Sequence, residues 1–237
     1  MPKSSAMATP ARGPIRIAVS GIDGSGKTEL CQRIAEYVRV AGRNAHIVGN
    51  LPRAYRQPVT AVVDLADPRL SSFFFNYAKL HHDDAGRARS AFTPRFVDYV
   101  MALEEVRIHH EAMAIAAESD VVVHDRHELD RRVHALRAGC NPDDLNLVFD
   151  QIPAPDLSVL LDLPARTALE RITRRGTRGY DENEADLTTN RCVYLDLVRD
   201  RPQVTVVDAR PAAAVVFNTV APLVTTLLTL RHLEQVR

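Results

Sequence analysis

The chain has 237 residues, of which 46% are hydrophobic, and its 30 Lys and Arg residues balance 30 Asp and Glu residues. This length and apolar content suit one α/β domain, and the lack of a basic excess argues against nucleic-acid or membrane-surface partners. Three scattered cysteines indicate neither a disulfide framework nor a clustered zinc site, so we expect a cytoplasmic protein. Residues 1–14 lack the apolar segment of a secretory signal and are predicted to form a disordered leader before a single domain at 15–237.

The first strong pattern is a glycine-rich loop that follows the apolar run at 15–19 and precedes a helical pattern. Its spacing is typical of a phosphate-binding loop, because glycines let backbone N–H groups surround phosphate oxygens and the next helix presents its positive end to the same anion. Lys27 is expected to reach the β- and γ-phosphates of a nucleotide, and the Thr28 hydroxyl to bind Mg²⁺. The residues assigned to nucleotide binding are Gly21, Asp23, Gly24, Ser25, Gly26, Lys27 and Thr28.

A helix at 27–40 and a strand at 45–48 complete the first βαβ pattern. Residues 49–92 are less regular, and we interpret them as a variable insertion on the acceptor side. The run His81-His82-Asp83-Asp84 has metal-ligating side chains, but it lacks helical i,i+4 spacing, which favours a solvated turn.

The next segment predicts a long helix from Thr93-Pro94 to about residue 117, followed by a buried strand at 121–123. Ligands of doubly wound sheets bind at the carboxyl ends of strands, and Asp125 lies at this end. We therefore predict that Asp125 holds hydrated Mg²⁺ opposite Thr28. The alternative is that Asp125 only caps the next turn.

Another helix starts at Asn141-Pro142, and a buried strand at 157–163 precedes a helix at 164–175. Four arginines fall within eight residues near the end of that helix, more than its dipole needs. We predict a lid at about 174–186 that closes over the nucleotide and neutralises charge on the transferred group, with a solvated basic face as the alternative. The four arginines are Arg171, Arg174, Arg175 and Arg178.

A helix at about 185–200, a strand at 204–207 and a C-terminal helix complete the predicted elements. The loop after the last strand places Arg210 where it can touch an adenine. The uncharged run at 211–230 contains Asn218 and Pro222, which favours a buried or dimer-facing helix over a membrane span.

The order and spacing of these patterns resemble the thymidylate kinase family of P-loop nucleoside-monophosphate kinases. The landmarks are GIDGSGKT, the triplet Asp125-Arg126-His127, the run PDLSVLLDLPARTALERITRRG and the strand that ends VVDA. The resemblance implies a three-layer, doubly wound five-stranded parallel sheet, ATP with Mg²⁺ as donor, and a homodimer. It also implies that Asp23 faces the acceptor, Arg126 grips the acceptor's phosphate, and Arg171 and Arg175 work in the lid.

The acceptor side departs from the family pattern. Family members carry an arginine on the long helix, and here that place holds Glu104 and Glu105, followed by Arg107. A buried carboxylate beside an incoming phosphate costs several kcal/mol, because like charges repel in a low-dielectric pocket. Glu128 and Asp130 also replace family residues after the triplet.

We therefore expect an ATP-dependent kinase with atypical acceptor specificity. The residues assigned to its acceptor are Asp23, Glu104, Glu105, Arg107, Arg126 and Arg178. One alternative is a genuine thymidylate or other nucleoside-monophosphate kinase in which Arg107, Arg131 or Arg132 replaces the missing arginine. Another is a regulatory protein that binds ATP without phosphorylating a small molecule.

Overall fold

The computed structural model describes residues 13–49, 93–176, 179 and 182–235. Most of the predicted leader and of the predicted insertion, including the His81-His82 pair, lies outside these ranges. Four residues of the predicted lid, at 177–178 and 180–181, lie outside them as well.

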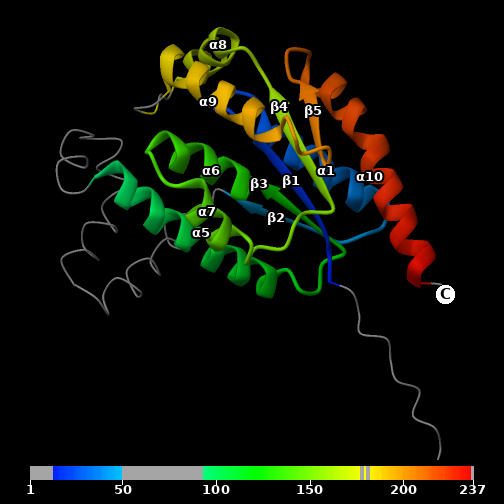
Figure 1. Ribbon diagram of the computed structural model, residues 1–237. Coiled ribbons are helices and arrows are strands. Elements are labelled where there is room, and N and C mark those ends of the chain that lie inside the picture. The colour runs from blue at the N-terminus through cyan, green and yellow to red at the C-terminus, as the bar shows by residue number, and fades with distance from the viewer. Residues whose placement is uncertain (1–12, 50–92, 177–178, 180–181, 236–237) are drawn as a thin grey trace, which may run out of the picture.

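Five parallel strands form one sheet in the order β2-β3-β1-β4-β5 (Figure 1). Strand β1 lies at the centre of the sheet, between β3 and β4, and β2 and β5 are the edge strands. This arrangement confirms the predicted doubly wound α/β sheet. The strands are β1 (Ile15–Gly21), β2 (Ala45–Gly49), β3 (Val121–Asp125), β4 (Leu157–Asp162) and β5 (Val204–Asp208).

Helices cover both faces of the sheet, which is how parallel sheets bury their apolar strands (Figure 1). Two helices, α1 (Lys27–Val40) and α10 (Ala213–Gln235), pack together on one face. The other helices are α5 (Pro94–Ile115), α6 (Glu128–Arg137), α7 (Pro142–Phe149), α8 (Ala165–Arg175) and α9 (Glu184–Val198). Of these, α5 packs on α6 and α7, and α9 packs on α6 and α8.

Strand β3 is fully buried and sends alternate side chains to opposite faces, as the pleat requires. Val121 and Val123 belong to the main core that includes α1, whereas Val122 packs with Ala112 of α5 and with Ala116, which follows that helix. This alternation places the two residues that follow, at 124 and 125, on opposite faces of the sheet.

Helix α6 was not predicted from the sequence. Its ten residues include five charged side chains, which hid the apolar positions. Leu129 and Val133 are nevertheless buried at i,i+4 spacing, and the Asp130 carboxylate accepts a hydrogen bond of 3.1 Å from the N–H of His127, the N-cap. An acidic side chain that reaches back to the N-cap is one half of a capping box and is a recognisable start signal.

Helix α10 is long and apolar enough to cross a membrane by length and composition, with 17% of its most apolar window buried. One face of α10 packs against α1. Val216, Val220 and Val224 lie in the core, Phe217 meets Tyr37 edge-to-face at 5.6 Å, and Tyr37 Oη lies 2.7 Å from the Thr225 hydroxyl. Leu230 and Leu233 are exposed on the same helix, so the predicted burial applies to one face only.

Gly49 ends β2 where the backbone of β3 passes very close. It has a φ of +142°, and a Cβ atom there would lie 2.3 Å from the carbonyl oxygen of Asp125 and 2.7 Å from the Asp125 Cβ. A side chain at this position must therefore displace the backbone that carries Asp125. Gly42, by contrast, has a φ of +76°, and a Cβ atom there would meet nothing within 4 Å.

These two glycines give a matched pair for denaturant unfolding. We expect Gly42→Ala to lower the free energy of unfolding by about 1 kcal/mol, because an alanine there meets only the penalty for a left-handed backbone. Gly49→Ala should lower the free energy of unfolding by about 2–4 kcal/mol, since a steric clash of about 1–3 kcal/mol adds to a backbone penalty like that at Gly42. Equal losses for the two variants would contradict the close approach of β2 to Asp125.

Candidate functional site

The parallel pairing of β1 with β3 brings two predicted site segments together. Val19 pairs with Asp125, so the loop after β1 starts beside the end of β3. The Thr28 hydroxyl, in the first turn of α1, donates a hydrogen bond of 2.6 Å to Asp125 Oδ2. The structure thus places the two predicted Mg²⁺ ligands in direct contact.

The loop at 21–28 has the backbone of an anion cradle. Gly26, with a φ of +96°, is the N-cap of α1, so the first N–H groups of that helix point toward the loop. Gly24 has a φ of +79°, and a Cβ there would lie 2.6 Å from the carbonyl oxygen of Ala168 in α8. Ser25 is buried, and among the described residues its hydroxyl has no hydrogen-bond partner. The hydroxyl is therefore available to an oxygen bound in the loop.

Lys27 folds back over the loop. Its Nζ donates hydrogen bonds of 2.6 and 2.8 Å to the carbonyl oxygens of Gly21 and Ile22, and the side chain is only 5% exposed. Burial, together with the nearby Arg126, lowers the pKa of Lys27 to about 8, although Asp23 opposes this shift. Phosphate oxygens are stronger partners for an ammonium group than these carbonyls, so a bound triphosphate would draw Lys27 to itself.

Arg126 and Asp23 form an ion pair beside the loop. The Arg126 Nη2 donates to Asp23 Oδ1. Burial alone would raise the pKa of Asp23, but Arg126 and Lys27 outweigh it and hold that pKa well below its usual value. Arg126 has a φ of 80°, the only positive φ of a non-glycine residue in the described ranges. Such a backbone is strained and persists where surrounding contacts enforce it.

Asp130 supplies those contacts. The carboxylate is buried and accepts hydrogen bonds of 2.7 Å from the Ser20 hydroxyl in β1 and from the Tyr194 hydroxyl in α9. Its Oδ1 also lies 3.6 Å from Arg126 Nη1. Burial, reinforced by Asp130, raises the pKa of Tyr194 well above its usual value, so Tyr194 stays a donor. Asp130 is thus a positioning group for Arg126.

Among the carboxylates that depart from the family pattern, Glu105 and Glu128 are held in ion pairs. Glu105 Oε2 lies 3.9 Å from Arg131 Nε. Glu128 accepts a hydrogen bond from Arg132 and another, of 3.4 Å, from Arg201. The side chains of Glu104 and Arg107, and all of Arg178, lie outside the described part of the structure.

Three of the arginines predicted for the lid and the adenine loop, Arg171, Arg175 and Arg210, have contacts within the described structure. Arg171 Nη2 donates to the carbonyl oxygens of Ala209, at 2.9 Å, and Arg210, at 3.1 Å, so Arg171 holds the predicted adenine loop onto α8. Arg175 donates a hydrogen bond of 2.7 Å to Glu182. Arg210 is exposed and pairs with Asp208 through two guanidinium nitrogens.

Sequence reasoning missed three buried histidines beside this site, namely His109, His124 and His127. Burial, with smaller contributions from neighbouring histidines and Arg16, lowers the pKa of His109 and of His127 to about 4 and that of His124 to about 2. All three are therefore neutral near pH 7. Two of them flank Asp125-Arg126 in the sequence, which is the signal that was available.

Comparisons with known proteins agree with the geometry. Residues 93–220, more than half of the chain, match the thymidylate kinase family. A thymidylate kinase from Xanthomonas campestris pv. campestris (strain B100) is 29% identical over 188 residues, covering 78% of this chain and 72% of that protein. A thymidylate kinase from Xylella fastidiosa (strain M12) is 26% identical over 217 residues, covering 91% and 88%.

Among solved structures, deoxyadenosine kinase from M. mycoides, with the products dCMP and dCDP bound, has a TM-score of 0.56 at 16% identity. The match covers 90% of this chain and all of that chain. At this identity the likeness shows the fold alone.

The lowered pKa of Lys27 predicts proton uptake when a nucleoside triphosphate binds. Above about pH 8 the free protein holds Lys27 largely neutral, whereas the phosphates favour its ammonium form and are themselves fully ionised there. Binding at about pH 9 should take up close to one proton and weaken by up to about tenfold per pH unit. Calorimetry in two buffers of different ionisation enthalpy measures this uptake.

The matched variant is Lys27→Met, which should bind more weakly and lose the uptake. Proton uptake that is absent from the wild type at about pH 9, or that persists in Lys27→Met, would contradict the assignment.

Proposed function

Because the chain belongs to the thymidylate kinase family, we propose that it transfers the γ-phosphoryl group of ATP to a small acceptor other than dTMP. The observation that carries the donor half of this proposal is the contact of 2.6 Å between Thr28 and Asp125 at the mouth of the loop. Membership of a kinase family makes the chain a phosphotransferase, which removes support for the alternative of a purely regulatory ATP-binding protein.

The residues at the loop fit Mg²⁺. A hydroxyl oxygen and a carboxylate oxygen in contact are the hard donors that this ion prefers, and Thr28 and Asp125 would hold it. When bound, Mg²⁺ supplies positive charge that neutralises the phosphates of the donor.

The protein's own groups then position and stabilise the transferred phosphoryl group. The backbone N–H groups between residues 21 and 28 hold the donor phosphates, and Lys27 leaves the carbonyl oxygens of Gly21 and Ile22 to contact them. Phosphoryl transfer needs little covalent work from a protein, so alignment and charge stabilisation supply most of the rate. Arg175, within the predicted lid, is the candidate for charge stabilisation on the opposite side.

The acceptor half rests on different observations. Support for an atypical acceptor comes from the carboxylates on α5, where Glu105 pairs with Arg131 of α6. A nucleoside-monophosphate acceptor is favoured by Arg126, whose side chain is 39% exposed and fixed by Asp23 and Asp130. A guanidinium held in this way is suited to bidentate contact with phosphate. A homodimer stays a prediction of the family resemblance, and a cytoplasmic location stays a prediction from the scattered cysteines.

An acceptor panel decides between the two candidates. We expect ADP release with a phosphate-free acceptor to exceed release with dTMP by at least about tenfold, a difference of about 1.4 kcal/mol in transition-state stabilisation. The panel contains nucleoside monophosphates and phosphate-free hydroxyl compounds, and phosphorus NMR identifies each product. If dTMP or another nucleoside monophosphate is the best acceptor, the chain is a nucleoside-monophosphate kinase and the atypical proposal is wrong.

Lys27→Ala should lower kcat by about 100- to 1,000-fold, because the lost contact acts mainly in the transition state. Arg33→Ala is the matched control, since Arg33 lies on the same helix and pairs at the surface with Glu29. Denaturant unfolding of both variants checks that the loss is not one of stability. Near-normal turnover by Lys27→Ala would place the chemistry elsewhere.

Glu105→Gln should raise KM for the acceptor severalfold while KM for ATP stays unchanged, because Glu105 lies on α5, away from the loop. Glu118→Gln, at an exposed position after the same helix, is the control. Unchanged acceptor kinetics in Glu105→Gln would remove this carboxylate from the acceptor site.

A further inference from the structure

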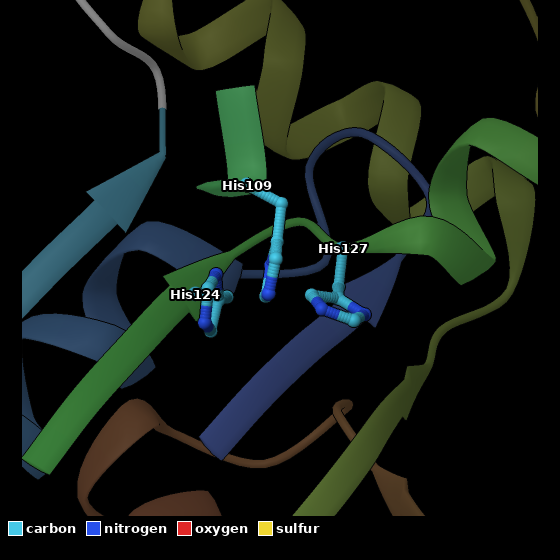
Figure 2. Close-up of side chains that lie close together, drawn as sticks. All are labelled: His109, His124 and His127. Atoms are coloured by element: carbon cyan, nitrogen blue, oxygen red, sulfur yellow. The ribbon is translucent and has the colours of Figure 1, made fainter. Parts of the chain in front are cut away.

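Three imidazoles meet inside the protein, on the face of the sheet covered by α5. His109 comes from α5, His124 from the end of β3 and His127 from the N-cap of α6. Figure 2 shows the His109 side chain descending from its helix between the other two rings. One ligand atom from each residue lies within 4.8 Å of the other two, and the rings of His124 and His127 are 4.9 Å apart.

Each ring has an unsatisfied nitrogen. Nδ1 of His109, Nε2 of His124 and Nε2 of His127 are buried without a hydrogen-bond partner among the described residues. The three residues are only 4%, 3% and 5% exposed. Buried polar atoms in folded proteins almost always have a partner. Three unsatisfied nitrogens at one place therefore indicate a shared partner that is not a protein group of the described ranges.

The charged groups near the rings are of both signs, since Arg16 is positive and Asp130, beside His127, is negative. An imidazole binds a metal ion through the lone pair of its unprotonated nitrogen. His109 and His124 are stacked 5.6 Å apart with an interplanar angle of 17°, so both rings border the same space.

We propose that His109, His124 and His127 bind one transition-metal ion, for which Zn²⁺ is the best fit. Nitrogen ligands suit zinc, and three histidines leave a fourth position for water or substrate. Tetrahedral zinc with Zn–N distances of about 2.0–2.1 Å places its ligand atoms about 3.4 Å apart. Rotation of the imidazole rings closes the gap from the spacing of up to 4.8 Å.

This site is separate from the Mg²⁺ site. Asp125 points toward α1 and contacts Thr28, whereas His124, its neighbour in β3, points to the opposite face and contacts His109 of α5. The ligand chemistry also differs, since one site offers oxygen and the other nitrogen. A bound zinc ion would cross-link α5 to β3 and to the start of α6, and so fix the helix that carries Glu105.

Zinc retention tests the proposal directly. The full-length protein is stripped with a chelator, supplied with excess Mg²⁺ to fill the oxygen site, and titrated with Zn²⁺ against a chromophoric competitor. We expect the wild type to bind one Zn²⁺ per chain. His109→Asn and His124→Asn should each lower the affinity for Zn²⁺ at least about 100-fold, which is more than the loss of a group outside the ligand shell causes. His110→Asn, the exposed neighbour, should bind like the wild type. Failure of the wild type to retain zinc, or retention by the double variant His109→Asn/His124→Asn, overturns the proposal.

Two measurements on the wild type keep the test valid if the variants fold poorly. Co²⁺ in place of Zn²⁺ should give the strong visible absorption of a tetrahedral nitrogen site. Crystals grown with Zn²⁺ should show an anomalous scattering peak among the three imidazoles. A peak at Asp125 or at a cysteine instead, with none between the histidines, contradicts the site.

Discussion

The parallel pairing of β1 with β3 is the constraint on which the site depends. With Val19 opposite Asp125, the loop that leaves β1 and the carboxylate that ends β3 lie at one level of the sheet. A slip of one residue in this register would turn Asp125 to the other face and bring His124 beside the loop, because side chains alternate along a strand. Three buried valines in β3 hold the register through apolar contacts on both faces. The geometry at the loop is thus a product of packing in the middle of the sheet.

A second constraint is the buried carboxylate of Asp130. It joins β1 through Ser20, α9 through Tyr194 and the start of α6 through the N–H of His127. Burying a charge is costly unless it is well bonded, and here the hydrogen bonds and the nearby Arg126 offset that cost. In return the strained backbone of Arg126 is held where its guanidinium meets Asp23. Elements that are distant in sequence therefore determine the direction of one side chain.

Local patterns predicted the loop at 21–28, all five strands and most helices, because each depends on residues that are close in sequence. Helix α6 was not predicted because its charged residues outnumber its apolar ones, although Asp130, which caps the start of the helix, was a signal for it. The partners of buried groups could not be predicted in this way. The contact of His109 with His124 depends on how α5 is rotated about its axis and on how it packs against β3. The contact of Arg171 joins α8 to the loop after β5, which is distant in the sequence.

The alternation along β3 also bears on how this protein can evolve. Under the proposed function, groups that face α1 serve the donor and groups that face α5 and α6 border the acceptor, so the pleat of one strand separates two sets of side chains. Substitutions on the α5 side would then accumulate without weakening ATP binding. Such a division lets a lineage explore new acceptors while it inherits an intact energy-donor machinery, and it tells a protein engineer which helix to randomise and which to leave alone.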